Sequence, residues 1–432
     1  MTQVSSQRAF VPSPRPHAPR EDSLKRPFYT QRELMEPADR AAGPQLTIGR
    51  PNRKRHDSDP CPSSITYAAL QHVWSLICGT HGDPLAPFAM AAGRRFWFSP
   101  DGTAALSYRV LNGYAVVAGD PIGNPGLYTA LVSSFAEMCR EHHWHVAVLG
   151  VSEPRLALWH SASSIVPRLA TVPIGRDVVI DVDGFSLAGR RKRNLRQAVQ
   201  RTHNAGMTTQ VVAENQVDDQ LRAELRGVML DSGKSADKER GFSMMLGGTL
   251  SGCYPGVWLI IARDRGGRIQ GFHRYASAGG GTDLSLDLPW RRRDAPNGTD
   301  ERLSVDMIQW AKEHGGQRVS LAFAPFPELF SEGTGHGLSR QSLRALAHIG
   351  DRFIKLESLY RYVRKFDAMS QERYVLFPAL HFGHALAVLI ALEFSPHHRS
   401  PTMSTATAAP NSVSSNRHLN TKQTGRQHDR NP

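Results

Sequence analysis

The segment from Thr282 to Glu301 constrains the fold more than any other part of the chain. It begins with alternating apolar and polar residues, which is typical of a half-buried β-strand: Leu284, Ser285, Leu286, Asp287 and Leu288. A cluster of arginines and an Asp-Ala-Pro-Asn-Gly turn follow, and apolar residues at three- and four-residue spacing then predict a helix. The segment therefore predicts a strand, a turn and a helix in direct succession.

The start of such a helix presents backbone N–H groups, which attract anions. Asp287 and the arginines at 291–293 lie beside it in the sequence. We therefore expect a site for a phosphate-bearing substrate, with Arg291, Asn297 and Gly298 among its contacts. The alternative is a turn that only joins a strand to a helix.

A second helix is predicted between Ser186, which suits an N-cap, and Gly206, which suits a C-terminal stop. Apolar residues cluster on one side of this helix, and arginines project from the other: Arg190, Arg193, Arg196 and Arg201. This basic face is either a solvated helix surface or a contact for RNA phosphates.

The length of 432 residues suits two domains with tails. Residues 1–56 hold eleven Lys or Arg against five Asp or Glu, and residues 396–432 hold five against one, so most of the formal charge of +13 lies in the tails. Their Pro- and Ser-rich composition predicts disorder over residues 1–60 and 396–432. The four cysteines form no CxxC pair, so neither a metal site nor a disulfide framework is indicated.

Five motifs occur in a fixed order along the chain: Val116–Gly123, Arg240–Met244, Asp294–Gly298, Arg318–Leu321 and Glu357–Arg361 followed by Lys365-Phe366. Together they resemble the C-terminal synthase domain of lysyl-phosphatidylglycerol synthases, the catalytic part of the bacterial multiple peptide resistance factor. The likeness runs from about Tyr67 to Phe394. It implies an α/β fold with mixed sheets, in which two GNAT-like acyltransferase domains stand in tandem.

On this basis we expect a first domain at 63–184, a connecting basic helix at 185–207 and a second, catalytic domain at 208–394. The apolar run from Phe382 to Leu392 is too short to span a bilayer. We expect it to be a helix that packs on the second domain, with a membrane-surface contact as the alternative. The N-terminus lacks the apolar core of a signal peptide, which favours a cytoplasmic protein.

The resemblance also implies that the chain moves an amino acid from aminoacyl-tRNA, its co-substrate, to a hydroxyl-type acceptor. Such an ester exchange needs no metal or other cofactor; it needs two placed substrates, a base and a cation for the oxyanion. Acetyl-CoA is not expected, because 293–298 lacks the paired glycines of a pyrophosphate loop. A non-catalytic tRNA-binding protein is the remote alternative, and the basic helix would carry tRNA in either case.

The motifs supply the site residues. Asp287 is the first candidate for the base or for holding the amino group; the alternative is an ion pair with Arg291 or Arg292. Either Lys365 or Arg361 would neutralise the oxyanion or a phosphate. Glu301 is a second-rank catalytic candidate. Asp120 is a second-rank candidate for binding substrate, although Asp120-Pro121-Ile122-Gly123 equally suits a structural turn after a strand.

Trp290 stands where the family has an arginine in its Asp-Leu-Met-Arg motif. A tryptophan offers one neutral donor and an apolar face, so it does not suit a lipid phosphate. Relatives of the resistance-factor type also carry a membrane domain. We therefore expect a small soluble hydroxyl or hydroxylamine acceptor, as in natural-product (antibiotic) biosynthesis. Phosphatidylglycerol, an anionic phospholipid, is the alternative.

Overall fold

The structure is a computed structural model, and it describes residues 67–161, 169–232, 245–325 and 361–394. The predicted tails, the Arg240–Met244 motif and the residues from Glu357 to Tyr360 lie outside these ranges. The first part of the chain contains these elements: α1 (Tyr67–Cys78), η1 (Ala86–Met90), β1 (Arg95–Phe98), β2 (Ala104–Leu111), β3 (Tyr114–Ala118), β4 (Ile122–Gly123), η2 (Pro125–Leu127), α2 (Tyr128–Glu141), β5 (His145–Ser152), η3 (Glu153–Arg155), α3 (Leu156–Ser161) and β6 (Leu169–Asp181).

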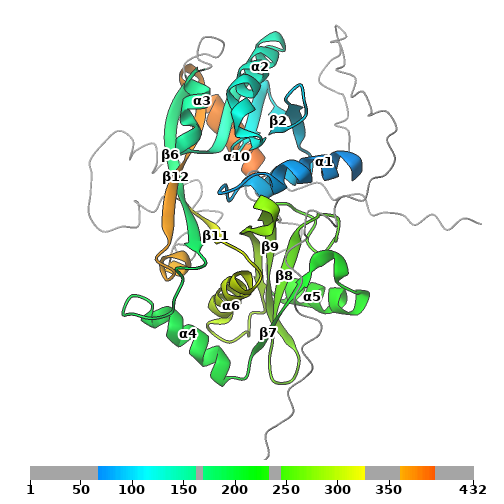
Figure 1. The fold of residues 1–432 in the computed structure, drawn as a ribbon, viewed down its shortest axis with the longest axis vertical. Helices are drawn as coiled ribbons and strands as arrows, with labels where there is room; N and C mark the ends of the chain where they lie inside the picture. Colours follow the sequence, from blue (N-terminus) through cyan, green and yellow to red (C-terminus); the bar gives the residue numbers. More distant parts are fainter. Residues whose placement is uncertain (1–66, 162–168, 233–244, 326–360, 395–432) are drawn as a thin grey trace, which may run out of the picture. The chain divides into compact units, whose positions relative to one another are not determined.

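The second part follows a basic helix: α4 (Arg193–Asn204), β7 (Thr208–Ala213), η5 (Glu214–Gln216), α5 (Asp219–Asp231), β8 (Val257–Arg263), β9 (Ile269–Ala278), η7 (Gly279–Gly281), β10 (Asp283–Arg291), α6 (Thr299–Glu313), β11 (Arg318–Pro325), β12 (Met369–Pro378), η8 (Ala379–His381) and α10 (Phe382–Phe394). All strands belong to one mixed sheet, in the order β1-β2-β3-β5-β12-β6-β11-β10-β9-β8-β7 with β4 beside β2. Figure 1 shows β6 and β12 running side by side between its two halves.

The two halves of the sheet repeat one topology that no sequence identity between them had suggested. In the first half, three antiparallel strands lead through α2 into β5, which pairs parallel with β3. In the second half, β8, β9 and β10 lead through α6 into β11, which pairs parallel with β10. This repeat agrees with the tandem GNAT-like α/β arrangement that the sequence resemblance implied.

Each half is a three-layer sandwich, because its strands bury side chains on both faces. In β3, Ala115 and Val117 pack with α2, whereas Tyr114, Val116 and Ala118 pack with α10. In the second half, α6 covers one face and α5 the other. Near-continuous apolar strands such as Val257–Arg263 are the expected sequence of such doubly covered sheets.

The C-terminal helix α10 forms as predicted, but its predicted position on the second domain was wrong. Ala385, Val388 and Leu389 pack against β3 and β12 in the first half. Strand β12 itself lies between β5 and β6. A boundary near residue 208 therefore does not separate the sheet into an N-terminal and a C-terminal domain, since residues beyond 368 complete the first half.

A β-bulge at Asp287 changes which face the end of β10 presents. Leu286 pairs with Tyr275 and Leu288 with Arg274, so Asp287 is the extra residue. Before the bulge, Leu284 and Leu286 pack with α6. After it, Leu288 and Trp290 pack with α5. The expectation that the three leucines share one face was therefore wrong for Leu288.

We predict that Trp290 contributes to stability as a core residue. It is 3% exposed and packs in the cluster that contains Leu225, Val228 and Phe272. Trp290→Ala should lower the free energy of unfolding by about 3–5 kcal/mol, because it removes a large buried side chain and leaves a cavity. Urea unfolding measures this, and the partly exposed Trp97→Ala is the control with a smaller loss. An equal loss from both variants would contradict a core role.

A buried arginine joins the middle of the sheet. Arg373 of β12 is 1% exposed, and its guanidinium contacts three carboxylates: Asp83 at 2.7 Å, Asp177 at 2.8 Å and Asp120 at 3.3 Å. It also donates to the Gly150 carbonyl at 3.0 Å. These residues come from β12, β6, β5, the end of β3 and the loop after α1, so a single side chain ties five segments together.

The cluster holds more carboxylates than cations, and burial shifts the pKa values of its carboxylates upward. Burial, and to a lesser extent Asp83, raise the pKa of Asp120 to about 6, although Arg373 and Ser152 act to lower it. Burial also raises the pKa of Asp177. For Arg373, burial by itself would lower the pKa, but the surrounding carboxylates raise it above its usual value. Asp120, predicted to bind substrate, thus lies in a buried structural cluster.

We predict a pH-dependent stability from Asp120. Its folded-state pKa exceeds the usual value of 3.8, so the folded state binds more protons between these values. Its contribution should be full below about pH 4 and lost as the pH rises through about 6. Urea unfolding over this range should show a shallower decline for Asp120→Asn than for the native protein. Glu137→Gln, which changes an exposed carboxylate, is the control; an unchanged slope in Asp120→Asn would contradict the prediction.

Candidate functional site

The parallel strands β10 and β11 pair only briefly and then part. Their pairing covers Asp283, Leu284 and Ser285, after which β11 continues along β6. In the first half, by contrast, β3 and β5 pair along all of Tyr114–Ala118. The second half therefore contains the place where two parallel strands separate beside a helix start, and Asp287 and the first turn of α6 lie next to it in the chain.

Asp287 is held in a second buried ion cluster. Its Oδ2 atom lies 2.6 Å from Nη1 of Arg274, and Nη2 of the same arginine lies 2.9 Å from Glu214. All three side chains are fully buried. Asp287 also accepts a hydrogen bond from the Leu246 N–H, and Glu214 accepts one from Leu250. Asp287 thus fixes residues 246–250 against the bulge of β10.

The expected anion site at the start of α6 is not open. Gly298 adopts a φ of 103°, and a Cβ atom there would lie 2.6 Å from the Ala198 carbonyl oxygen of α4. Helix α4 therefore packs directly on this turn. The first turn of α6 also carries Asp300 and Glu301, whose negative charges suit the helix N-terminus and oppose a phosphate. Asn297 is exposed in the same turn.

Two predicted catalytic residues meet beside this turn. Nζ of Lys365 lies 2.5 Å from Oε1 of Glu301, although 64 positions separate them in sequence. The Glu301 side chain is 11% exposed and the Lys365 side chain 36% exposed. Arg361 is exposed one helical turn before Lys365. A carboxylate and an ammonium group at the edge of solvent can exchange protons and stabilise a developing negative charge.

A chain of hydrogen bonds next to this pair was missed by the sequence reasoning. Oδ1 of Asp300 lies 3.2 Å from Nε2 of the fully buried His273, whose Nδ1 lies 3.4 Å from Oγ of Ser304. Ser304 in turn contacts the Tyr362 hydroxyl at 2.5 Å and the Tyr275 hydroxyl at 3.4 Å. Burial raises the pKa of both tyrosines well above the usual value. The adjacent carboxylates Asp300 and Glu301, in the first turn of the predicted helix, are the sequence signal that points to this chain of hydrogen bonds.

Two arginines at the end of β10 have protein partners. Nε of Arg291 lies 3.3 Å from Oδ2 of Asp300, and its side chain is 42% exposed. Arg292 contacts Asp231 at 3.2 Å and donates to the Ile269 carbonyl. Arg291 therefore joins the first turn of α6, whereas Arg292 ties α5 to β9.

The basic helix forms, but it begins later than predicted. Ser186 accepts a hydrogen bond from Ala188 and caps a turn, and α4 starts at Arg193. Its buried face contains Leu195, Ala198 and Thr202. The predicted basic residues are all exposed: Arg190, Arg193, Arg196 and Arg201. Lys192 donates to the Phe366 carbonyl, which places the start of α4 beside Lys365.

The predicted residues thus form separate groups. Glu301, Lys365 and Arg291 come together at the start of α6, with α4 packed alongside. Asp287 lies in the Arg274 cluster, Asp120 lies in the Arg373 cluster, and Trp290 is in the core.

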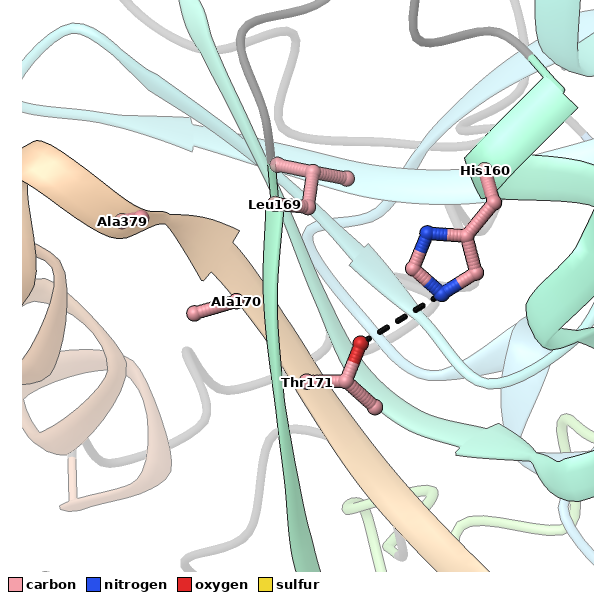
Figure 2. A pocket seen from close by; sticks show the side chains of 5 residues that line it. All are labelled: His160, Leu169, Ala170, Thr171 and Ala379. Atoms are coloured by element: carbon pink, nitrogen blue, oxygen red, sulfur yellow. Dashed lines mark hydrogen bonds between the residues drawn. The ribbon is translucent and has the colours of Figure 1, made fainter.

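A pocket of about 570 Å³ lies elsewhere, in the first half. It is lined by residues from α3, β6 and η8: His160, Leu169, Ala170, Thr171 and Ala379. Figure 2 shows the His160 ring and the Thr171 hydroxyl pointing toward one another, with 3.5 Å between Nε2 and Oγ1. None of the predicted site residues lines this pocket. Its two alanines and one leucine are apolar, so only His160 and Thr171 offer polar side chains to a ligand.

Comparisons with known proteins identify the family to which this chain is similar. The family described as phosphatidylglycerol lysyltransferase, C-terminal, matches residues 76–377. The MprF-like domain protein Rv1619 of Mycobacterium tuberculosis is 57% identical over 330 residues, which are 76% of this chain and 68% of that protein. The lysylphosphatidylglycerol biosynthesis bifunctional protein LysX of Rhodococcus opacus is 30% identical over 312 residues. That match covers 71% of this chain but only 27% of the relative.

The fold has a counterpart among solved structures. The structure of L-PGS from Bacillus licheniformis superposes with a TM-score of 0.63 at 20% sequence identity, over 75% of this chain and 97% of that one. The mixed α/β, GNAT-like fold is therefore shared. In the part of the chain that the structure describes, no helix is both long and apolar enough to cross a membrane. The profile match and the close relative together show that this chain belongs to the phosphatidylglycerol lysyltransferase C-terminal family.

Proposed function

We propose that this protein transfers an amino acid from aminoacyl-tRNA to a hydroxyl group of an acceptor. The observation that carries the proposal is the Glu301–Lys365 ion pair at the start of α6, beside the exposed basic helix α4. Family membership supports the same reaction. The acidic first turn of α6, covered by α4, argues against the pyrophosphate of acetyl-CoA at this helix start.

In the proposed reaction the acceptor oxygen attacks the carbonyl carbon of the aminoacyl ester. Glu301 takes the proton of the attacking hydroxyl, and Lys365 stabilises the negative charge of the tetrahedral oxyanion. The ester bond to the tRNA ribose then breaks, and the proton passes from Glu301 to the departing ribose oxygen. One ester replaces another, so the atoms and charges balance without an energy-rich co-reactant.

The other site residues take supporting roles in this proposal. Arg291 and His273 hold the two oxygens of Asp300, which fixes the first turn of α6 next to Glu301. Asp287 has a positioning role, because it is fully buried against Arg274 and holds residues 246–250 in place. Arg361 lies on the same exposed side as Lys365 and suits a phosphate of either substrate.

For the acceptor we propose phosphatidylglycerol, whose glycerol headgroup offers a free hydroxyl. The case for a small soluble acceptor rested in part on Trp290, but this residue packs in the core with α5. Its replacement of the family arginine therefore says nothing about the polarity of a pocket. The name of the bifunctional relative supports the lipid, and a small hydroxyl compound remains the second acceptor to test.

We predict tRNA-dependent product formation. The full chain, incubated with a pool of charged tRNA and phosphatidylglycerol vesicles, should form aminoacylated lipid that mass spectrometry detects. RNase should abolish the reaction, and depletion of coenzyme A should not change it. Phosphatidylcholine vesicles are the lipid control, and a lipid-free small-molecule extract tests the second acceptor. Product formed from free amino acid and ATP after RNase treatment would contradict the proposal.

We also predict that the ion pair is catalytic. Glu301→Gln should lower the transfer rate by about 10²–10⁴-fold, because the amide cannot accept the proton. Lys365→Ala should also lower kcat, and Lys365→Arg, which keeps the positive charge, should retain part of the native kcat. The matched controls lie at the other end of α6, where Glu313→Gln and Lys312→Ala change exposed residues. Equal rates in the Glu301 and Glu313 variants, with both folded, would remove Glu301 from the mechanism.

A further inference from the structure

The exposed basic surface extends from α4 onto the turn between β8 and β9. In this turn, Nη2 of Arg265 donates to the Asn204 carbonyl at the end of α4, at 3.0 Å. Gly206 has a φ of 75°, and a Cβ atom there would lie 2.2 Å from Nε of Arg265. The glycine therefore lets the arginine lie directly against the C-terminal end of the helix.

Positive charge predominates on this surface, and the one carboxylate within the β8–β9 turn, Asp264, accepts hydrogen bonds from Gly266, Arg268 and Gln270. No Asp or Glu occurs from Gly184 to Ala213, whereas this stretch holds the exposed arginines of α4. The two arginines that flank Arg265 have carboxylate partners: Arg263, at the end of β8, pairs with Glu224, and Arg268 pairs with Asp294. The hydrogen bond of Arg265 goes to a backbone carbonyl instead, so its positive charge adds to that of α4.

The two ends of α4 meet different parts of the protein. At the N-terminal end, Lys192 donates to the carbonyl of Phe366, whose chain neighbour Lys365 pairs with Glu301. At the C-terminal end lies Arg265. A helix of 12 residues, such as α4, is about 18 Å long. The basic surface therefore runs in a line from the proposed reaction site to the β8–β9 turn.

We propose that α4 and the β8–β9 turn form one RNA-binding surface with a fixed direction. The single-stranded 3′ end of the tRNA, which carries the amino acid, lies at the Lys192 end of α4. The base-paired stem of the acceptor arm lies at the other end, against Arg201 and Arg265. This inference rests on the proposed function and deepens it, because the reacting ester must reach Lys365 and the stem then continues along α4.

The chemistry of these side chains suits this partner. An arginine fork can bind two phosphate oxygens at once, and Arg265 uses only part of its five N–H donors on Asn204. Contacts to the RNA backbone fix position without reading sequence. This matches a surface that must accept the shared shape of acceptor stems. The competing role of Arg265 is internal, as a cation that stabilises the C-terminal end of the α4 dipole.

The test measures equilibrium binding of the full chain to three uncharged RNAs over a series of salt concentrations. These are whole tRNA, a hairpin of the acceptor stem with its 3′ end, and a single strand with the same 3′ end. Arg265→Ala should lower the slope of log affinity against log salt by about 0.7–0.9 for tRNA and the hairpin, and leave the single strand unchanged. Arg193→Ala, near the other end of α4, should lower the slope for all three.

Two further variants separate RNA contact from support of the helix. Arg265→Lys keeps the charge and loses the fork, so it should keep the native slope for the hairpin. Arg140→Ala removes an exposed arginine of α2 in the first half and should leave every slope unchanged. Thermal melting of each variant reports the stability of the fold. Weaker binding of all three RNAs by Arg265→Ala, together with a lower melting temperature, would assign Arg265 to the helix and overturn the proposal.

The remaining outcomes are also decisive. If Arg265→Ala kept the native slope of log affinity against log salt with every RNA, this inference would be overturned. The proposal that aminoacyl-tRNA is the donor would still stand. An effect of Arg265→Ala on the single strand alone would reverse the proposed direction and overturn it too. If the native chain bound none of the three RNAs, both this inference and the proposed donor would fail.

Discussion

Two buried arginines, each surrounded by more than one carboxylate, hold the sheet and its loops in place. Arg373 contacts Asp83, Asp120 and Asp177, and Arg274 contacts Glu214 and Asp287. Removing one partner of a buried pair leaves an uncompensated charge, which typically costs about 3–5 kcal/mol. Because every carboxylate comes from a different element, these contacts specify which segments meet. The position of residues 246–250 depends on the Arg274 cluster, because Leu246 and Leu250 donate hydrogen bonds to Asp287 and Glu214.

The two clusters differ in what they position. The Arg373 cluster lies where β5, β12 and β6 run together, so it joins the halves of the sheet. The Arg274 cluster lies at the bulge of β10, and it holds the chain that precedes β8 against the strand. In the second half, the parallel strands β10 and β11 pair only over Asp283–Ser285. The two repeats therefore differ in structure: a buried ion cluster joins the strands of the first, and the parallel strands of the second separate after three residues.

Local patterns in the sequence predicted most of the elements, because they depend on nearby residues. The strand, turn and helix from Thr282 to Glu301, the basic face of α4 and the stop at Gly206 all follow from periodicity and turn chemistry. The bulge at Asp287 could not be predicted, since it is set by the pairing with β9. The partners of Asp287 and Asp120 were also missed, because Arg274 and Arg373 reach them only through strand pairing. The Glu301–Lys365 pair was found as two separate residues, and only the fold showed that they touch.

Strand β12 has a consequence for how the chain assembles. It lies between β5 and β6, and Arg373 pairs in register with Ser152, more than two hundred positions earlier in the sequence. During synthesis, therefore, β5 and β6 emerge long before the strand that separates them, and their facing edges stay without their native neighbour until the last strand is made. Pairings this distant slow folding, because a long loop must close first. The strands of the second half have all been made once β11 has emerged, although Val363 and Phe366 of its core follow later in the chain. The N-terminal repeat therefore needs β12, which is made after all strands of the second half, to complete its part of the sheet.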